Sequence, residues 1–426
     1  MSNKLSTDSY KGVRDFFPED LRLRKHIFEV MRKTAESYGY VEYDASILEP
    51  AELYKAKSGE EIVNDQTYTF TDRGGREVTL RPEMTPTVAR MVAARRRDLG
   101  YPLRWYSIPN LFRYENPQRG RLREHYQLNV DIFGVADISA DIEVIQVANS
   151  VMRAFGATDK DFSILINSRK LLLSLFEKFI LTPEQIHTIS KLIDKKDKVS
   201  ADVFEDSIST IFENRTDEFI SLLSLPGKLL EFLGPDNESV KKIIKLIEEL
   251  GKLEINNVVF SPTLMRGFDY YTDVVFEIFD TNSENRRSLF GGGRYDNLLE
   301  LFGGDTVPAV GFGMGDVTLT DFLSTHNLLP KTKTETDAIL ATIGEVDQGE
   351  IILLGDRLRQ KGLRLAINTI TKKPADAIKS ALKQGVNWMI FVGPDELEKK
   401  IYTLKNLSTE ETFSISEEEI VTKIKS

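Results

Sequence analysis

The sequence predicts an α+β protein built around an antiparallel sheet, followed by a smaller α/β domain at its C-terminal end. Three observations support this prediction. In roughly the first 165 residues, segments with strand-like alternation are joined by Gly- and Pro-containing turns, as in hairpins, and are mixed with helical segments. From about 168 to 250 the pattern becomes that of consecutive amphipathic helices. After a polar linker that begins near residue 331, strands and helices alternate.

The first elements are placed by their periodicity and by their turn residues. Apolar residues at helical spacing predict a helix from about residue 21 that ends at Gly39, and a short strand is expected after it. Residues 60–83 are expected to form a hairpin that turns at Gly74 and Gly75, because adjacent glycines accept the backbone angles of tight turns.

Two further helices follow in the first part of the chain. Residues 85–100 have helical spacing and are entered through Pro86, a residue that suits the first turn of a helix. Residues 137–156 also read as a helix, for which Ser139 or Asp141 is expected to provide the N-terminal cap.

A longer hairpin is predicted between these two helices. Residues 103–115 are rich in aromatic and β-branched side chains, 116–120 supply Pro and Gly for a turn, and polar residues alternate with mostly apolar ones from Arg121 to Asp131. One face of this second strand is therefore largely apolar. The other face carries Arg121, Arg123, His125, Gln127, Asn129 and Asp131.

Arginines are concentrated in this hairpin although the formal net charge of the chain is -10. Arg113, Arg119, Arg121 and Arg123 fall within eleven positions. Such a run can simply be a solvated loop. The strand pattern instead favours a polyanionic ligand such as a nucleotide, because the planar guanidinium group makes bidentate contacts with phosphate.

Composition excludes several classes of function. The chain has 426 residues, 41% of them hydrophobic, enough for two or three domains. It has no cysteine, which excludes disulfides, thiolate metal sites and a cysteine nucleophile, and four histidines leave little material for a zinc site. No apolar stretch approaches the roughly 18 to 20 residues that span a bilayer, so a cytoplasmic protein without a membrane segment is expected. The acidic balance argues against nonspecific coating of nucleic acid, but it allows a local basic groove for one folded RNA.

Individual motifs are weak signals by themselves. Arg81 and Glu83 precede a helix and could serve only its entry. Tyr270 and Tyr271 are expected on opposite faces of a strand, so that only one of them would reach a given ligand. Three glycines at 291–293 allow either close approach to a ligand or a tight hairpin turn.

Common nucleotide and hydrolase motifs are absent from the sequence. Residues 311–316, GFGMGD, have Asp316 where the third glycine of a dinucleotide-binding fingerprint belongs. No Walker lysine pattern, nucleophile elbow or HExxH motif occurs.

Taken in order, the motifs resemble those of histidyl-tRNA synthetases, a family of class II aminoacyl-tRNA synthetases, along nearly the whole chain. The resemblance rests on five segments: GVRDFFPED at 12–20, TLRPEMTP at 79–86, the motif 2-like FRYENPQRGRLREHYQLNVDIFG at 112–134, RGFDYYT at 266–272 and GGGRYDNL at 291–298. RGFDYYT and GGGRYDNL are similar to blocks specific to histidine enzymes, and the C-terminal part resembles the family's anticodon-binding domain.

The resemblance implies a class II synthetase-like antiparallel sheet flanked by helices. Residues 1–167 and 252–330 would form the two parts of a catalytic core, 168–251 a helical insertion, and 336–426 an anticodon-binding-like α/β domain.

The resemblance also assigns roles to residues of this chain. The residues expected to bind histidine are Glu83, Thr85, Gln127, Asp131, Tyr270 and Tyr271. Those expected to bind ATP are Arg113, Glu115, Arg121 and His125, with Arg113 and Arg266 acting on the α-phosphate as the catalytic pair. Positioning and charge neutralisation are what adenylate formation requires, which is consistent with the absence of a nucleophile motif.

One motif departs from the family pattern. Where class II enzymes usually end motif 3 with Gly-x-Glu-Arg, this chain has Asp316, Val317 and Thr318. Either a basic residue from elsewhere supplies the missing charge, or ATP is bound poorly; Asp316 could alternatively bind Mg²⁺.

The resemblance therefore implies a homodimeric enzyme that uses ATP and Mg²⁺ to ligate L-histidine to tRNA(His) through a histidyl-adenylate. The alternative is an inactive paralogue that senses histidine as a regulatory subunit of ATP phosphoribosyltransferase.

Overall fold

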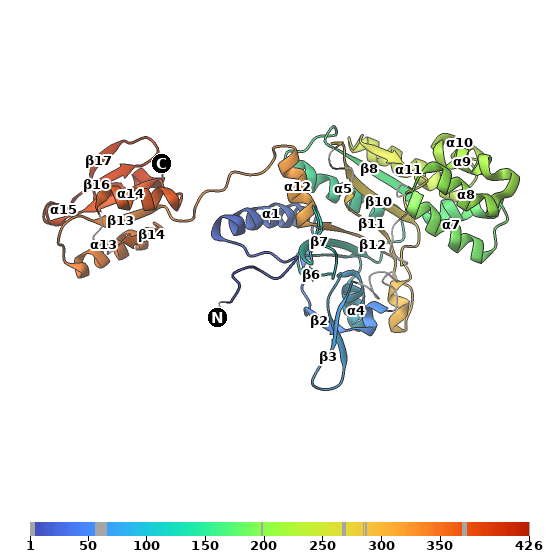
Figure 1. The fold of residues 1–426 in the computed structure, drawn as a ribbon, viewed down its shortest axis with the longest axis horizontal. Coiled ribbons are helices and arrows are strands. Elements are labelled where there is room, and N and C mark those ends of the chain that lie inside the picture. Colours follow the sequence, from blue (N-terminus) through green and yellow to red (C-terminus); the bar gives the residue numbers. More distant parts are fainter. Residues whose placement is uncertain are drawn as a thin grey trace. The chain divides into compact units, whose positions relative to one another are not determined.

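The computed structural model of the protein is shown in Figure 1. It describes residues 5–55, 66–196, 199–265, 270–283, 285, 288–368 and 373–425. Among these residues, no helix is long and apolar enough to cross a membrane.

A nine-stranded sheet lies at the centre of the larger part of the described chain. Its strand order is β1-β5-β7-β12-β11-β10-β8-β9, and β6 pairs with β7 next to β5. All neighbouring pairs are antiparallel except β1 with β5 and β8 with β9. The strands are β1 Val41–Glu42, β5 Leu103–Ser107, β6 Asn110–Phe112, β7 Glu124–Phe133, β8 Phe162–Ser168, β9 Val258–Phe260, β10 Val274–Asp280, β11 Ser288–Arg294 and β12 Ala309–Gly315.

The predicted long hairpin is confirmed as β5, β6 and β7. Trp105 pairs with Asp131 and Leu111 with His125, both in antiparallel register. The predicted start of the second strand at Arg121 is wrong, because β7 begins only at Glu124. The carbonyl of Gly12 accepts hydrogen bonds from the backbone N–H groups of Arg123 and Glu124. The N-terminal segment of the chain therefore pairs with the residues at the start of β7.

A three-stranded sheet of β2, β4 and β3 confirms the second predicted hairpin. Gly75 lies at its turn with φ of 76°. The helix before these strands ends as expected, since Gly39 follows it with φ of 80°. The elements are α1 Pro18–Ser37, β2 Leu48–Pro50, α2 Glu52–Lys55, β3 Tyr68–Thr71, β4 Glu77–Leu80 and α4 Thr85–Arg95.

Helix α5, Ser139–Ala154, begins where the sequence predicts, but neither Ser139 nor Asp141 caps it. The side chain of Asp137 accepts a hydrogen bond from the Ser139 N–H at 2.9 Å. Asp141 instead turns inward and forms a buried ion pair with Arg294. Asp141, which the sequence pattern predicted as a cap of α5, therefore pairs with the distant Arg294 instead.

Six helices among the described residues fill most of the region between β8 and β9, which confirms the predicted helical texture there. They are α6 Arg169–Lys178, α7 Pro183–Lys195, α8 Ala201–Phe212, α9 Thr216–Ser224, α10 Pro226–Leu233 and α11 Glu238–Lys252. Aromatic packing joins them, with the rings of Phe212 and Phe219 stacked at 3.8 Å between centroids. The last helix, α11, also packs against α5, β8 and β9.

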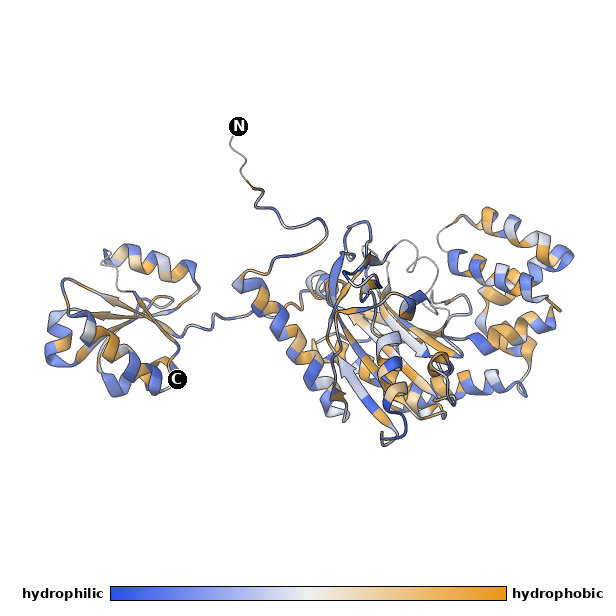
Figure 2. Ribbon diagram, turned by 90° about the horizontal axis from the view of Figure 1, so that it is seen from below, coloured by the Kyte–Doolittle hydropathy of each residue, from blue (hydrophilic) through white to orange (hydrophobic). Residues whose placement is uncertain are grey.

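Helices α5, α11 and α12, Asp316–Thr325, pack against the large sheet, while the β3–β4 hairpin and α4 lie on its other side in Figure 1. Figure 2 shows hydrophobic residues concentrated in the strands of the sheet. One core cluster joins α4, the ends of β5 and β7, and the short helix η3, Leu298–Phe302, and it includes Tyr270, Tyr271 and Tyr295. The pocket described below is therefore continuous with the hydrophobic core.

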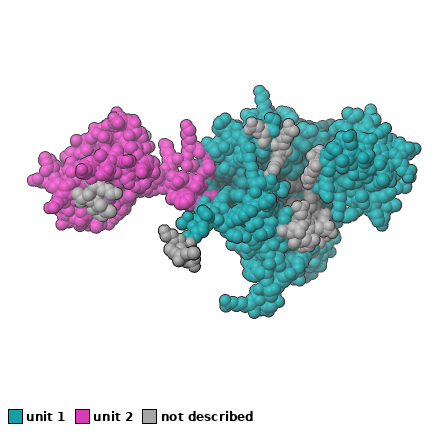
Figure 3. Space-filling model, in the orientation of Figure 1, with its two compact units in different colours: residues 1–15, 24–329 teal, residues 16–23, 330–426 magenta. Residues whose placement is uncertain are grey.

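The chain divides into two compact units, coloured separately in Figure 3: residues 1–15 with 24–329, and residues 16–23 with 330–426. The second unit contains a sheet of order β14-β13-β15-β16-β17, in which β14, β13 and β15 are parallel. This confirms the predicted C-terminal α/β domain. Its elements are β13 Ala338–Thr342, α13 Gln348–Gln360, β14 Leu365–Asn368, α14 Pro374–Lys383, β15 Trp388–Val392, α15 Pro394–Lys399, β16 Ile401–Asn406, β17 Thr412–Ser416 and α16 Glu417–Lys425.

Candidate active site

A pocket opens over β7, β11 and β12 and gathers most of the residues expected to bind histidine. Its walls are formed by Glu83, Thr85, Arg113, Gln127, Asn129, Tyr270, Tyr271, Gly291, Tyr295, Gly311, Phe312 and Gly313. These residues come from six separate segments of the chain, and the fold brings them together. Of the histidine-binding residues expected from sequence, Asp131 alone is absent from the lining, and it contacts the pocket through Tyr295.

A carboxylate and a phenol form the first polar contact of the pocket. Tyr270 Oη donates a hydrogen bond to Glu83 Oε2 at 3.0 Å. Both side chains are buried. Glu83 lies between β4 and α4, and burial together with the Glu83 charge raises the pKa of Tyr270 well above its usual range, so this phenol remains a donor. The pair provides an anionic acceptor suited to an ammonium group.

Asp131 provides a second carboxyl group beneath the pocket. It lies on β7 and accepts a hydrogen bond from Tyr295 Oη. Burial raises the pKa of Asp131 to about 7, and the bond from Tyr295 partly opposes that rise. A carboxyl group that titrates near neutrality can accept a proton or a hydrogen bond from an imidazole, whose own pKa is about 6.5.

Glycines on β12 leave room for the β7 side chains to reach across the sheet. A Cβ atom at Gly311 would overlap the carboxylate of Asp131, and one at Gly313 would lie 2.7 Å from the side-chain carbon Cδ of Gln127. The glycines of the GFGM run, which does not match the dinucleotide-binding fingerprint, are therefore explained by the lack of space for a side chain at these positions. Gly292 and Gly293 are equally crowded but lie within β11, so the hairpin-turn alternative for residues 291–293 is wrong.

The prediction that only one of the two tyrosines, Tyr270 or Tyr271, would reach a ligand is also wrong. Tyr270 and Tyr271 both line the pocket, with ring centroids 4.9 Å apart. The alternation rule does not apply to them because they precede β10, which begins at Val274.

Arg113 brings a positive charge to the site. Arg113 lines the pocket and donates from Nε to the carbonyl of Pro82 at 2.9 Å. His125 lies two positions before Gln127 on β7, and its pKa falls to about 3 because the ring is buried and because Arg113 and Arg14 are positively charged neighbours. His125 is therefore neutral at physiological pH, which suits stacking on an uncharged base.

Arg121 and Glu115 lie in the connection between β6 and β7. Arg121 Nη1 is 3.5 Å from Glu115 Oε2, and over half of the Arg121 side chain is accessible. Arg123 has a structural position instead, since its guanidinium lies 3.9 Å from the ring centroid of Tyr114 and bonds to Tyr10.

Asp316, the residue that departs from motif 3, is engaged by the protein on both oxygens. Arg14 Nη2 donates to Oδ2 at 2.8 Å, and the Tyr126 N–H donates to Oδ1 at 2.9 Å. The described residues contain no group of three or more acidic or histidine side chains arranged for a metal ion. The Mg²⁺ role expected for Asp316 therefore gains no support from its contacts.

Sequence reasoning missed three contributors to this region. Tyr295 and Gly311 stand in segments already singled out, GGGRYDNL and GFGMGD, but their spacing alone does not reveal the contact with Asp131. Arg14 stands in GVRDFFPED, and its ion pair with Asp316 spans 302 positions of sequence. Arg266, expected as the second catalytic arginine, lies outside the described residues.

Comparison with known proteins agrees with this arrangement. The histidyl-tRNA synthetase family model matches residues 12–317, and an anticodon binding domain model matches 339–426. A histidine–tRNA ligase of Leptospira biflexa is 42% identical over 434 aligned positions, covering 99% of this chain and 98% of that relative. One of Thermoplasma volcanium is 36% identical, covering 98% and 97%.

Comparison with solved structures shows the same fold. The crystal structure of histidyl-tRNA synthetase from Nostoc sp. PCC 7120 superposes with a TM-score of 0.83 and 22% identity, covering 99% of each chain. The pocket, the two family matches and the full-length relatives agree: this chain belongs to the histidyl-tRNA synthetase family.

Proposed function

We propose that the protein ligates L-histidine to tRNA(His) in two steps, first forming histidyl-adenylate from histidine and ATP. The observation that carries this proposal is the pocket itself. Buried carboxyl groups paired with tyrosines line or support the pocket, and the guanidinium-bearing Arg113 lines it as well. This charge distribution suits an amino acid whose cationic groups enter one end while its carboxylate faces a bound nucleotide.

Histidine is bound in this proposal by the acceptors around β7. Glu83, with Thr85 and Gln127, holds the ammonium group, and the Glu83–Tyr270 bond keeps the carboxylate oriented. Asp131 accepts from the imidazole, and its bond from Tyr295 fixes that carboxyl group. Hydrogen-bonding both ends of the substrate gives strong rejection of amino acids that lack these groups, because buried acceptors would then be left unpaired.

ATP is bound by the arginines and by His125. Arg113 contacts the α-phosphate, together with Arg266, and Arg121 with Glu115 lies at the far end of the triphosphate. Neutral His125 stacks on the adenine. Bringing the histidine carboxylate and the α-phosphate together and neutralising the developing charge are the tasks of these side chains.

Arg14 supplies the positive charge that motif 3 lacks. It is held at the end of β12 by Asp316. It is also close enough to His125 for its charge to lower the pKa of that ring. A guanidinium in this position can meet a nucleotide bound over His125, so loss of the usual arginine at position 318 does not remove the cation from the site. Mg²⁺ accompanies ATP through the phosphates, as is usual for this ion.

The other regions of the chain are proposed to bind tRNA and to form a homodimer. Residues 336–426 bind the anticodon and the helical region of 168–251 contacts the acceptor end, while residues 1–167 and 252–330 form the catalytic core. Exposed apolar side chains at Val41, Ile47 and Leu48 support a homodimer formed through this part of the larger unit. The enzyme would act in the cytoplasm.

The histidine-sensing regulator is not favoured. The match to an anticodon binding domain over residues 339–426 and full-length relatives called histidine–tRNA ligases both support the enzyme.

The deciding experiment is ATP–pyrophosphate exchange with each of the twenty amino acids in turn. Exchange with histidine alone, followed by transfer of histidine to tRNA(His), is expected. Histidine binding by calorimetry without any exchange would overturn the enzymatic proposal in favour of the regulator.

A further inference from the structure

The segment 270–273 connects the pocket wall to β10 and is held by contacts from outside the pocket. Tyr270 and Tyr271 form the wall, while Thr272 and the buried Asp273 are not part of the lining. The Thr272 N–H donates to the carbonyl of Arg294 at 2.7 Å, which ties the segment to β11. Thr272 Oγ1 also contacts Asp296, and Tyr270 bonds to Glu83, while further contacts come from the helical region.

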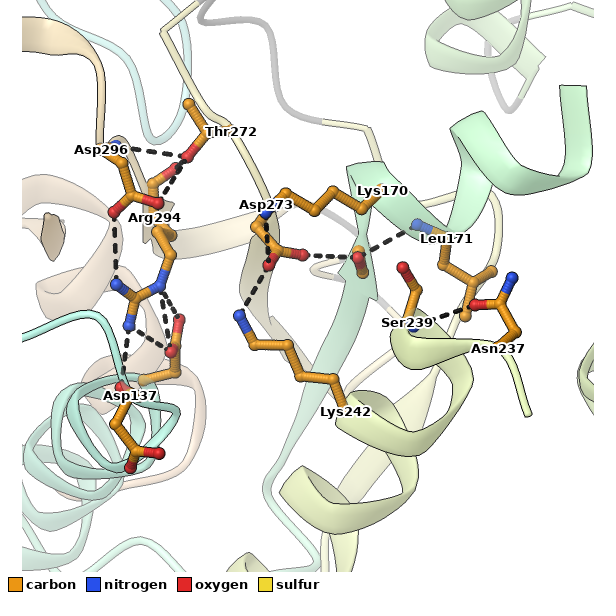
Figure 4. Close-up of polar contacts among 12 residues, drawn as sticks. Asp137, Lys170, Leu171, Asn237, Ser239, Lys242, Thr272, Asp273, Arg294 and Asp296 are labelled. Carbon is orange, nitrogen blue, oxygen red and sulfur yellow. Dashed lines mark hydrogen bonds and ion pairs between the residues drawn. The ribbon is translucent and has the colours of Figure 1, made fainter. Parts of the chain in front are cut away.

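Asp273 is a buried carboxylate whose partners come from both ends of the helical region. Lys242 Nζ, on α11, lies 2.6 Å from Oδ2. Ser168 Oγ, at the start of α6, donates to Oδ1 at 2.7 Å, and Lys170 Nζ lies 3.8 Å from Oδ2. Figure 4 shows the Lys170 and Lys242 side chains extending toward Asp273. Since Asp273 is 2% exposed, its charge depends on these partners for compensation.

The backbone of the wall has a second contact with the same helices. Arg169, the first residue of α6, donates from Nη1 to the carbonyl of Tyr271 at 3.0 Å. The Arg169 N–H also donates to the carbonyl of Asp273 at 3.0 Å. Ser168 accepts from the Leu171 N–H as the N-cap of α6, so the cap of the helix and the carboxylate of Asp273 share one hydroxyl group.

The first and last helices of the helical region therefore hold the residues that follow the two tyrosines. A shift of α6 or α11 must either move this segment or separate a buried carboxylate from its countercharge. Separation is costly, because a buried charge without a partner strongly destabilises a protein. Movement of the wall is the less costly response.

We propose that Lys242 is a positioning residue that, through Asp273, sets the Tyr270–Tyr271 wall and couples the helical region to the amino-acid pocket. This inference rests on the proposed function, in which that wall holds histidine. Coupling of this kind is reciprocal: histidine binding restrains α11, and a ligand such as a tRNA acceptor end on the helical region changes histidine affinity.

The test replaces Lys242 by Met in the full-length protein, which keeps the aliphatic length and removes the charge. Lys241→Met is the matched control, since Lys241 is an exposed neighbour on the same helix whose ion pair is with Glu238, three positions earlier. In pyrophosphate exchange, Lys242→Met is expected to raise the KM for histidine about tenfold, within the usual range of coupling between sites, and to leave the KM for ATP unchanged. Lys241→Met is expected to change neither.

A second readout separates positioning from a loss of stability. Hydrogen exchange of the α11 peptides is measured with and without histidine, at a temperature where both variants are fully folded. Histidine is expected to protect α11 in the wild type and in Lys241→Met but not in Lys242→Met. Equal protection in all three proteins, or an unchanged KM for histidine, overturns the proposal.

If Lys242→Met does not fold, Asp273→Asn replaces it as the test. This change removes the charge that Lys242 compensates and retains an acceptor for Ser168. The same selective rise in the KM for histidine is expected, and an unchanged KM contradicts the coupling. Failure of the wild type to exchange with histidine would instead contradict the proposed function, so the two failures are distinguishable.

Discussion

Asp131 offers the sharpest test of how the pocket works, because its burial and its proposed role have opposite consequences for stability and for binding. The change is Asp131→Asn, which keeps the size and an acceptor for Tyr295 and removes the charge. In the folded protein the pKa of Asp131 is about 7, against 3.8 for an ordinary aspartate. The folded state therefore binds a proton more tightly than the unfolded state, and the wild type loses stability as pH rises from about 4 to about 7.

The size of this effect follows from the pKa difference. A raised pKa of roughly three units corresponds to about 4 kcal/mol, at 1.36 kcal/mol per unit. The uncharged amide of the variant carries no such penalty. We therefore expect Asp131→Asn to match the wild type near pH 4 and to exceed its free energy of unfolding by up to about 4 kcal/mol above pH 7.

Urea unfolding measured across this pH range provides the assay. Trp105 is the cross-strand partner of Asp131 on β5, and Trp388 belongs to the C-terminal unit. With Trp388→Phe as the common background, fluorescence reports on the larger unit alone. The same proteins are then compared in pyrophosphate exchange, where loss of a hydrogen bond to a charged group, about 1.5 to 3 kcal/mol, should raise the KM for histidine roughly 10- to 150-fold.

Two results would refute this reasoning. A stability difference that does not grow between pH 4 and pH 7 would show that burial does not raise the pKa of Asp131. An unchanged KM for histidine would show that this carboxyl group does not contact the substrate.

Three other predictions concern the nucleotide end, the C-terminal unit and the buried ion pairs. Arg14→Ala should raise the KM for ATP in pyrophosphate exchange about tenfold or more and leave the KM for histidine unchanged. An equal rise in both KM values would show that Arg14 has only a structural role. Removal of 331–426 should preserve exchange and abolish most aminoacylation, and equal loss of both activities would make this unit structural. Asp141→Asn should lower the free energy of unfolding by about 3 to 5 kcal/mol in thermal or urea melts, because the buried guanidinium of Arg294 loses its fully buried carboxylate partner and keeps only the more exposed Asp296. The control Asp159→Asn breaks a partly exposed ion pair and should cost less than about 1 kcal/mol.

The local sequence pattern predicted the structure correctly where the geometry depends only on residues close together in the chain. The period of two along β7 correctly placed Gln127 and Asn129 on the pocket face, since side chains alternate along any strand. The end of α1 at Gly39 and the turn at Gly75 followed from glycines with positive φ. These features depend on neighbours within a few residues.

Local pattern failed where a distant segment intervenes. Arg121 and Arg123 continue the alternation of β7 but lie outside it. The backbone of Arg121 pairs with Gln118, and the N–H of Arg123 donates to the carbonyl of Gly12. Asp141 has the position of a capping residue, but a buried arginine from β11 engages it.

The sequence by itself determined the family and the order of the elements, and it pointed to about half of the residues that meet in the pocket, because motif order, strand alternation and turn chemistry can be read along the chain. Tertiary structure alone decided that Arg14 reaches Asp316, that Tyr295 supports Asp131, and that Lys242 compensates Asp273. Each of these contacts joins segments that are distant in sequence. Burial makes such contacts strong and necessary, because a carboxylate removed from water requires a partner, and only the folded sheet determines which side chain that is.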